Sequence, residues 1–257
     1  MNSPLKVVSV RIGECQSHFY KHAIRTLTPL GVNWETVAMP VDTSRNEILM
    51  KIGALNSDPS VHGIMIMKPV VSSHLSISLL QQSLHPHKDI EGMHPTNLGK
   101  IVYGQQDTLW PVTAKAAIEV LCSMRGSLQG SEVLVIGTSD VLAKPITSLL
   151  HAEGATVTVC CPSISNLAAY SRSADIVITA VSNGIRFSSE GMFKPGCVVI
   201  DLGSNLNSDG LFVGGDVDMR ACKISKFASL THGVGVVRTS VLVNNLVRAV
   251  ELQLENI

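Results

Sequence analysis

The 257-residue sequence has no surplus of charge of either sign, since 20 Lys and Arg residues balance 20 Asp and Glu residues. Nucleic acids and anionic membranes bind clustered positive charge, so this balance argues against both as the main partner. No apolar run approaches the roughly 18–20 residues that a membrane-spanning helix needs. The first residues also lack the pattern of a signal peptide or an Arg-rich transit peptide, and we therefore expect a cytoplasmic protein.

Paired cysteine motifs are absent as well. The six cysteines include no C-x-x-C pair, and the adjacent Cys160 and Cys161 would point to opposite faces of a strand. We expect reduced structural thiols in a cytosol-like compartment, with a redox or metal role as the alternative, and we assign no metal site. Apolar residues make up 45% of the chain and charged residues 16%. This composition allows a sizeable buried core and does not favour disorder.

The apolar pattern predicts two successive series of strands and helices. The first series alternates strands and helices over 7–10, 16–30, 34–39, 44–55, 63–67 and 75–84. A helix is predicted at 113–124, and the second series begins at Glu132 and continues over 133–136, 144–153, 155–160, 165–171, 175–180 and 197–201. Such alternation is typical of parallel sheets with crossover helices.

Three further segments complete the outline of the chain. Residues 86–103 are rich in Gly, His, Pro and Asn and predict an irregular segment, residues 205–215 predict a turn-rich excursion, and a long helix follows from about Thr239. We therefore predict an α/β fold with two domains around a cleft. The first domain is expected at 1–110, completed by a returning C-terminal helix at 239–257. The second, Rossmann-like domain is expected at 111–238.

A glycine turn follows the strand at 133–136. The apolar strand is followed by Gly137, a polar turn and a helix start, which is the arrangement of a phosphate-binding unit in an open parallel sheet. Backbone N–H groups of Gly137, Thr138 and Ser139 can meet a pyrophosphate without side-chain charge. The full G-x-G-x-x-G fingerprint is absent, so an ordinary turn between strand and helix is the alternative.

The end of the next strand bears on the choice of nucleotide. Cys161 is followed by Pro162 and Ser163, without the Asp or Glu that NAD-binding proteins usually place there. This absence favours NADP, with Lys144 and Ser163 or Ser165 near the added phosphate; NAD remains possible.

Residues 86–99, PHKDIEGMHPTNLG, resemble the KDVDG…NxG segment of the methylenetetrahydrofolate dehydrogenase/cyclohydrolase family. Other segments resemble motifs of the same family in the same order: HGIMIMKP at 62–69, PVTA at 111–114, VIGTSDVLAKP at 135–145, KPGCVVID at 194–201, GDV at 215–217 and THGVG at 231–235. The resemblance covers nearly the whole chain. It implies tetrahydrofolate in the first domain, NAD(P) in the second, and a homodimer.

The resemblance also implies two sets of site residues. For tetrahydrofolate they are Tyr20, Met67, Lys68, Glu91 and Gly233. For NADP they are Thr113, Gly137, Thr138, Ser139, Lys144, Ser163, Ala180, Val181, Gly235 and Thr239.

Two catalytic positions of the family are changed in this sequence. The family carries a Tyr-x-x-x-Lys pair on its first helix; with Tyr20 as the ring the lysine position is Ile24, and with Phe19 as the ring it is Ala23. The accompanying glutamine is Met67, whose thioether donates no hydrogen bond. Lys68 is adjacent, but neighbouring strand residues face opposite ways, so it restores the charge only if the strand ends at Met67.

The carboxylate position of the family is also altered. Glu91 replaces an aspartate and is one methylene longer. The resemblance implies that it contacts the pterin, and a structural salt bridge near Lys88 is the alternative.

The resemblance implies two reactions, transfer of a hydride from methylenetetrahydrofolate to the nicotinamide and hydrolysis of the resulting methenyl cation. We expect the changed positions to affect these two reactions differently. Hydride transfer needs chiefly that donor and acceptor carbons be held face to face, whereas hydrolysis of the methenyl cation needs a general acid or base. A chain without the lysine is expected to lose cyclohydrolase before dehydrogenase activity. The alternatives are a non-catalytic ligand-binding or regulatory relative, and a dehydrogenase for a different one-carbon carrier.

Overall fold

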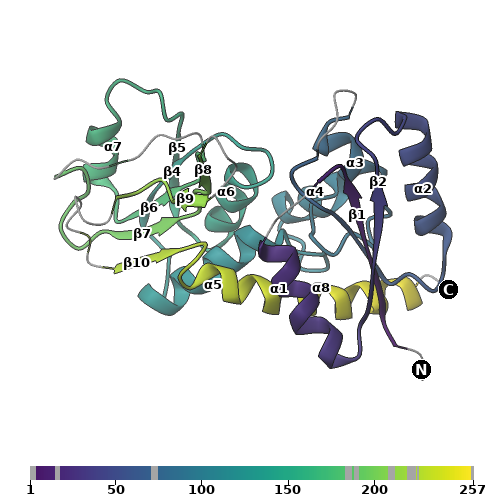
Figure 1. The fold of residues 1–257 in the computed structure, drawn as a ribbon. Helices are drawn as coiled ribbons and strands as arrows, with labels where there is room; N and C mark the ends of the chain where they lie inside the picture. Colours follow the sequence, from purple (N-terminus) through teal and green to yellow (C-terminus); the bar gives the residue numbers. More distant parts are fainter. Residues whose placement is uncertain are drawn as a thin grey trace. The chain divides into compact units, whose positions relative to one another are not determined.

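The computed structural model describes residues 4–14, 18–70, 75–182, 187, 191–207, 212–218, 224 and 226–255. The chain divides into two compact units (Figure 1), of which unit 1 comprises Met1–Val112 and Thr239–Ile257 and unit 2 comprises Thr113–Arg238. Both units are built on parallel sheets with helices, so the predicted α/β class is confirmed. In the described part of the chain, no helix combines the length and apolar character needed to cross a membrane.

Unit 1 contains a three-stranded parallel sheet in the order β2-β1-β3. Its elements are β1 (Lys6–Ile12), α1 (His18–Leu27), η1 (Thr28–Leu30), β2 (Asn33–Met39), α2 (Arg45–Ser57), β3 (Gly63–Ile66), α3 (Ile77–Ser83) and α4 (Pro95–Val102). Figure 1 shows β1 and β2 side by side with α2 next to them. The predicted start of α1 at Gln16 lies outside the described residues, and the helix ends at Leu27, where a 3-10 turn carries Pro29.

The core of unit 1 lies between one face of this sheet and helices α2 and α3. Alternate residues of β1 and β3 point to that face because side chains alternate along a strand. The buried side chains of this core are Val8, Val10, Ile12, Ile48, Ile52, Ile64, Ile66 and Leu80. Helix α2 starts as the sequence predicted, since the Ser44 side chain accepts a hydrogen bond from the Glu47 amide at 3.3 Å.

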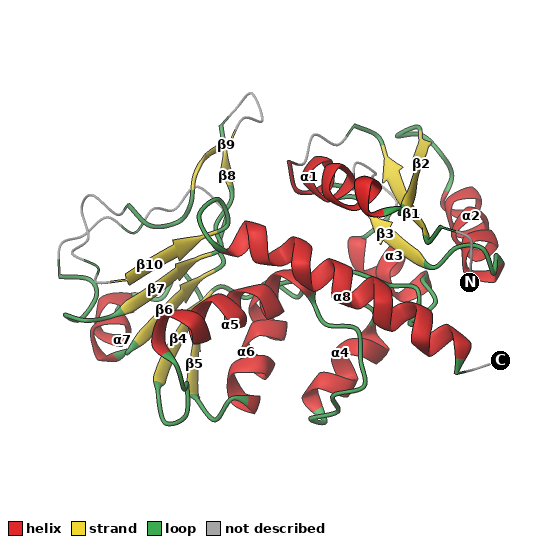
Figure 2. Cartoon of the chain, turned by 90° about the horizontal axis from the view of Figure 1, so that it is seen from below, coloured by secondary structure: helices red, strands yellow, loops and turns green. Residues whose placement is uncertain are grey.

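Unit 2 contains a five-stranded parallel sheet in the order β10-β7-β6-β4-β5, and Figure 2 shows these strands side by side. Its elements are α5 (Val112–Arg125), β4 (Glu132–Ile136), α6 (Ala143–Ala152), β5 (Thr156–Cys160), α7 (Leu167–Ser173), β6 (Ile176–Thr179), β7 (Val198–Asp201), β8 (Asn205–Leu206), β9 (Phe212–Gly214) and β10 (Lys226–Ser229). The predicted excursion at 205–215 contains the antiparallel pair β8–β9, and its residues 208–211 lie outside the described part. Helix α8 (Val234–Leu254) begins in unit 2 and continues into unit 1.

Three sequence-based expectations were wrong. Residues 86–103 are not irregular throughout, because α4 begins at Pro95 with His94 as its N-cap, and His94 Nδ1 accepts a hydrogen bond from the Thr96 amide. Strand β10 was not predicted; it pairs with β7 at one edge of the sheet. The last helix begins at Val234, five residues before the expected start at Thr239.

The last helix leaves some apolar side chains exposed and buries a polar one. Val247 and Leu254 are exposed, whereas Asn245 is buried. Its side-chain amide donates to the carbonyls of Ile90 and Trp110, and its oxygen accepts from the Trp110 amide. A buried polar side chain is tolerated when its hydrogen bonds are satisfied, which explains this departure from the apolar pattern.

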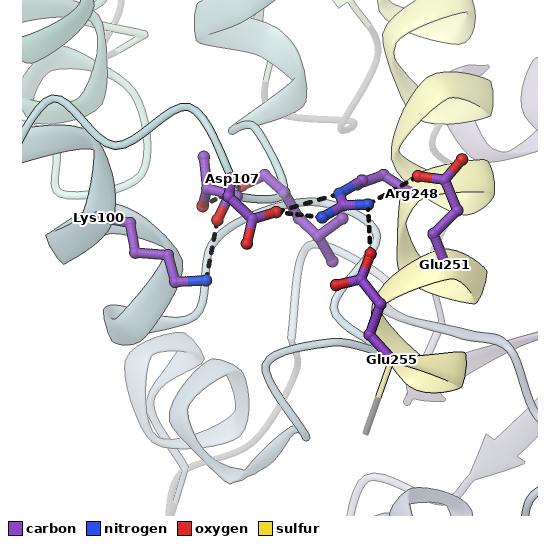
Figure 3. Close-up of polar contacts among 7 residues, drawn as sticks. Lys100, Asp107, Arg248, Glu251 and Glu255 are labelled. Carbon is purple, nitrogen blue, oxygen red and sulfur yellow. Dashed lines mark hydrogen bonds and ion pairs between the residues drawn. The ribbon is translucent and has the colours of Figure 1, made fainter. Parts of the chain in front are cut away.

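The end of α8 is held to unit 1 by a group of charged side chains (Figure 3). Arg248 pairs with Asp107, Glu251 and Glu255, and the Lys100 ammonium donates to the Asp107 carbonyl at 2.8 Å. Hydrogen bonds to Glu251 and Asp107 raise the pKa of Arg248. This network lies near the surface, so we expect it to orient the helix end more than to stabilise the fold.

Candidate functional site

The sheet of unit 2 reverses its order at one place. Strand β4 has β5 on one side and β6 on the other. After β5 the chain therefore crosses back over β4 to add β6. In open parallel sheets, ligands bind at the carboxyl ends of the strands at such a reversal. The residues at these two ends are Gly137 and Ala180, both of which the sequence had indicated.

Gly137 and Ala180 approach each other so closely that no side chain fits at position 137. Gly137 has φ of +139°, and a Cβ built there would lie 2.5 Å from the Ala180 carbonyl oxygen. The Ala180 amide donates to the Ile136 carbonyl at 2.8 Å. The glycine is therefore required by a close backbone approach and by its φ value.

The amides of the glycine turn are not all available to a ligand. The Gly137 amide donates to the Cys160 carbonyl at 2.9 Å, which continues the pairing of β4 with β5, so the expectation that it meets a pyrophosphate was wrong. The Ser139 carbonyl accepts from the Lys144 amide at 3.1 Å and leads into α6. Thr138 is exposed and Ser139 is half-buried.

The segment that follows Ala180 is fixed by a carboxylate that the predicted site did not include. Asp216 accepts hydrogen bonds from the Val181 amide at 2.8 Å and the Ser182 amide at 3.0 Å. Asp216 is fully buried, and Ser182 has a positive φ of 54°. The GDV motif at 215–217 was the available sequence signal, but the motif does not say which amides the carboxylate binds.

A second buried carboxylate supports the first. Asp201, at the end of β7, accepts from the amides of Asp216 and Val217 at 2.9 Å each, and from the Thr179 hydroxyl at 3.0 Å. Burial raises the pKa of Asp201, although its hydrogen bonds act in the opposite direction. The ends of β6 and β7 and the Asp216 segment are thus joined by one hydrogen-bonded group.

The remaining predicted cofactor residues are more scattered. Lys144 is exposed and pairs with Asp140 at 2.5 Å, and the Ser163 hydroxyl lies 3.1 Å from the Cys161 sulfur. Thr113 opens unit 2 within α5. These side chains are available to a ligand, but the hydrogen bonds found among the described residues of unit 2 do not join them to the group around Asp216.

Two predicted residues lie at the start of α8. Gly235 would place a Cβ 2.3 Å from the Leu230 carbonyl oxygen, so this helix entry requires glycine. The Thr239 hydroxyl is buried and has no hydrogen-bond partner among the described residues. Gly233, predicted as a folate residue, is exposed in unit 2 with φ of +103°.

The sheet of unit 1 also reverses its order, between β1 and its neighbours β2 and β3. Met67 and Lys68 directly follow β3 and therefore lie at the carboxyl end where a ligand is expected. Met67 is buried, and its amide donates to the Val10 carbonyl at 2.9 Å.

Tyr20, from α1, contacts this strand end directly. Its hydroxyl donates to the Ile66 carbonyl at 3.0 Å and accepts from the Lys68 amide at 3.1 Å. Ile24 lies one helical turn later and is half-buried, whereas Ala23 is fully buried. Residues four apart share a helix face. The geometry therefore favours Tyr20 and Ile24, rather than Phe19 and Ala23, as the equivalents of the Tyr-x-x-x-Lys pair.

Lys68 pairs with Glu91. The distance from Lys68 Nζ to Glu91 Oε1 is 3.3 Å, and the lysine side chain is about one-third exposed while the glutamate is buried. Strand β3 ends at Ile66, so the strict alternation that would turn Lys68 away from Met67 does not apply. Lys88 is not the partner of Glu91, because its ammonium donates to the carbonyls of Leu55 and Asp58.

Asp89 lies close to this pair and is fully buried. Burial is the main cause that raises the pKa of Asp89 to about 7, and the charge of Glu91 acts in the same direction. The hydrogen bond from the His94 amide, at 2.5 Å, and the charge of Lys68 act against the rise. Two carboxyl groups and one ammonium therefore lie close together in unit 1.

The backbone around Glu91 is tightly held. The Glu91 carbonyl accepts from the Val112 amide at 3.1 Å, and Asn245 binds the neighbouring Ile90 carbonyl. Gly92 has φ of +69°, and a Cβ there would lie 2.2 Å from the Trp110 backbone. Asn245 was missed in the sequence, because a single Asn in a helix carries no signal of its partners.

Within the described residues, no group of three His, Cys, Asp or Glu side chains is arranged to hold a metal ion. Two family models match the chain. The model described as tetrahydrofolate dehydrogenase/cyclohydrolase, catalytic domain, matches residues 2–91, and that of the NAD(P)-binding domain of the same family matches residues 111–254.

Similar proteins cover almost the whole chain. The bifunctional protein FolD 2 of Mesorhizobium japonicum is 39% identical over 257 residues, which cover 97% of this chain and 83% of that protein. The bifunctional protein FolD of Rhodobacter capsulatus is 38% identical over 251 residues, covering 95% and 83%.

Solved structures agree with this similarity. The bifunctional enzyme FolD of Campylobacter jejuni has a TM-score of 0.88 at 28% identity, covering 97% of this chain and 89% of that chain. A 5,10-methylenetetrahydrofolate dehydrogenase from the silkworm Bombyx mori has a TM-score of 0.86 at 27% identity, covering 98% and 88%.

Proposed function

The chain belongs to the tetrahydrofolate dehydrogenase/cyclohydrolase family, and on that premise we propose that it is an NADP-dependent methylenetetrahydrofolate dehydrogenase that has lost methenyl hydrolysis. The observation that carries the proposal is the contrast between the two units. Unit 2 keeps the close approach of Gly137 and Ala180, whereas unit 1 has Ile24 and Met67 at the positions of the lysine and the glutamine.

Oxidation of the methylene group requires a hydride acceptor, which a bound nicotinamide supplies. The protein has to bind and orient the two reactants. The carboxyl ends of β4 and β6 and the segment held by Asp216 support a cofactor site in unit 2. We include Thr113, Thr138, Ser139, Val181 and Gly235 of unit 2 in this proposed site; Thr239 belongs to unit 1, and its predicted role rests on the resemblance alone.

Hydrolysis of the methenyl cation makes a different demand, because a proton must move at the attacking water. Ile24 has no titratable group, and the Met67 thioether accepts hydrogen bonds only weakly and donates none. The Lys68 ammonium is bound to Glu91, so it is not placed as a free base. These three features support a loss of the second reaction.

We propose that tetrahydrofolate binds unit 1 at Tyr20, Met67, Lys68 and Glu91. These residues come from α1, from the end of β3 and from the segment before α4, and hydrogen bonds connect three of them. Gly233 lies in unit 2, and its predicted role in folate binding rests on the resemblance of its motif alone.

The preference for NADP rests on the end of β5. Cys160 ends that strand, and the following Cys161, Pro162 and Ser163 include no carboxylate to bind ribose hydroxyls. Lys144 and Ser163 are exposed and are proposed to contact the additional phosphate.

The function is tested by supplying the purified protein with methylenetetrahydrofolate and either NADP or NAD, and by supplying methenyltetrahydrofolate alone. We expect reduction of NADP with a lower KM than for NAD, and no methenyl hydrolysis above the uncatalysed rate. Measurable hydrolysis would contradict the proposed loss. Calorimetric titrations that detect neither cofactor nor tetrahydrofolate would replace the proposal by the non-catalytic alternative.

We also propose a cytoplasmic homodimer. Among the described cysteines, Cys122, Cys160 and Cys161 are not joined in disulfides, which suits a reducing compartment. Leu206, Phe212 and Val213 of the β8–β9 pair are exposed, and exposed apolar side chains that lie together are typical of association surfaces. Light scattering on the purified protein tests this point, and a monomeric mass would contradict it.

A further inference from the structure

We propose that Lys68 is a positioning residue that holds the Glu91 carboxylate for the substrate, an inference that rests on the proposed function of unit 1. In the family motif that HGIMIMKP resembles, a leucine stands at the position of Lys68, so the resemblance assigns no role to this charge. The pairing of Lys68 with Glu91 is an observation of this structure.

The first argument is the burial of Glu91. Its side chain is about 9% exposed, and its carboxylate is paired with the Lys68 ammonium at 3.3 Å. A buried carboxylate without a partner is strongly disfavoured in its charged form. The nearby Asp89 is also an acid and offers no positive charge to Glu91. In the described structure, Lys68 is the only positive side chain at hydrogen-bonding distance from Glu91.

The second argument is the way in which Lys68 is directed toward Glu91. The Lys68 amide donates to the Tyr20 hydroxyl, which in turn donates to the Ile66 carbonyl. This bridge fixes the backbone directly after β3 ends. From this fixed backbone the Lys68 side chain reaches Glu91, so hydrogen bonds connect Tyr20, Lys68 and Glu91 in one group.

The third argument is the chemistry of the ligand. A carboxylate offers about four lone-pair sites, and Lys68 uses Oε1 of Glu91, which leaves Oε2 to accept from a ligand. A reduced pterin presents an amino group beside a ring N–H, and such paired donors suit an ionised carboxylate. Lys68 holds one oxygen of Glu91 and so orients its longer side chain, which compensates for the additional methylene relative to aspartate.

This assignment differs from the catalytic lysine of the family. The Lys68 ammonium is directed at the Glu91 carboxylate, 3.3 Å away, and Lys68 is adjacent to, not at, the Ile24 and Met67 positions of the family pair. Lys68 is therefore expected to affect binding of the pterin and not the hydrolysis of a methenyl group. The expected kinetic signature is a change in KM for the folate with little change in kcat.

The test uses the full chain with the substitutions Lys68→Leu, Lys68→Arg, Glu91→Gln and the double substitution Lys68→Leu/Glu91→Gln, with Lys51→Leu as a control on the exposed side of α2. We expect Lys68→Leu to raise the KM for methylenetetrahydrofolate about tenfold or more, with kcat within about twofold and the KM for NADP unchanged. Lys68→Arg keeps the positive charge, so its KM for methylenetetrahydrofolate should stay close to that of the wild type. The KM of the double variant for methylenetetrahydrofolate should be no higher than that of Glu91→Gln alone, because both substitutions act through one carboxylate.

Several results would overturn the inference. An unchanged folate KM in Lys68→Leu, a loss in kcat alone, or additive losses in the double variant would each show that Lys68 does not act through Glu91. Thermal unfolding and NADP titration of each variant identify a general loss of structure, which would change both units and not the folate KM alone. A wild-type protein that binds no tetrahydrofolate would overturn the proposed function together with this inference, whereas normal binding by both wild type and Lys68→Leu would overturn the inference only.

Discussion

The side chain of Asp201 accepts a hydrogen bond from the backbone amide of Asp216 at 2.9 Å, so one buried carboxylate fixes the position of another. Asp216 then receives the amides of Val181 and Ser182. This arrangement links the end of β7 to the segment after β6, next to the glycine turn. A residue that contacts no ligand can in this way determine where a ligand-binding backbone lies.

Asp216→Asn should weaken NADP binding about tenfold or more, since a hydrogen bond to a charged acceptor contributes about 1.5–3 kcal/mol. An asparagine offers one acceptor oxygen where the carboxylate serves two amides, so its NH₂ group would face an amide donor. Calorimetric titration with NADP measures the effect, with Glu153→Gln at an exposed position of the same unit as the control. Equal affinity in the two variants would contradict this account.

Gly137→Ala should both destabilise unit 2 and abolish NADP binding. Its Cβ would lie 2.5 Å from the Ala180 carbonyl oxygen in addition to the unfavourable φ. The matched control is Gly126→Ala, which has φ of +86° and nothing within 4 Å of the added Cβ. We expect the control to lose about 1–2 kcal/mol from backbone strain alone and to keep NADP binding. Urea unfolding and NADP titration of both variants test this, and similar losses in both would disprove the steric argument.

Ile24→Lys combined with Met67→Gln should introduce methenyl hydrolysis. Ile24 is half-buried on the helix face of Tyr20, where an added ammonium would approach the end of β3. A positioned acid or base contributes about 10²–10⁴-fold to such a reaction. The measurement is the decay of methenyltetrahydrofolate absorbance, with Ile24→Met as a control of similar size and no charge. A double variant that hydrolyses no faster than the control would show that the lost reaction needs more than these two groups.

Asp89 should make the stability of unit 1 depend on pH between about 4 and 7. Burial raises its pKa from 3.8 to about 7, so the folded protein holds this proton more tightly than the unfolded chain does. Its stabilising contribution is full below the unfolded pKa and is lost as the pH rises through the folded pKa, an effect of a few kcal/mol.

The Asp89 prediction is checked by comparing wild type with Asp89→Asn in urea unfolding at several pH values. The free energy of unfolding of wild type, minus that of the variant, should fall as the pH rises from about 5 to 8. Asparagine resembles the protonated acid and does not titrate, so it removes this one contribution. A difference that stays constant over this range would contradict the raised pKa.

Local patterns in the sequence predicted most of the elements in their order, although α4 and β10 were missed. Each predicted strand is present within two residues of its expected ends, because alternation and apolar runs reflect the burial of neighbouring residues. The glycine turn at Gly137 was found for the same reason, since it depends on a few consecutive residues. The assignment of Ile24 and Met67 to the positions of the family lysine and glutamine stays a prediction.

The tertiary structure decided which distant groups meet. Lys68 and Glu91 are 23 residues apart in the sequence. Their contact depends on the end of β3 at Ile66 and on the hydrogen bond from the Lys68 amide to the Tyr20 hydroxyl. The bond from Asn245 to Ile90 spans 155 residues and is equally invisible in a local pattern. The sequence by itself therefore determined the family and most of the two series of elements, whereas the absence of the family lysine stays a prediction. Only the folded chain showed that a different lysine is paired with the carboxylate, because that pairing depends on where separate elements place their side chains.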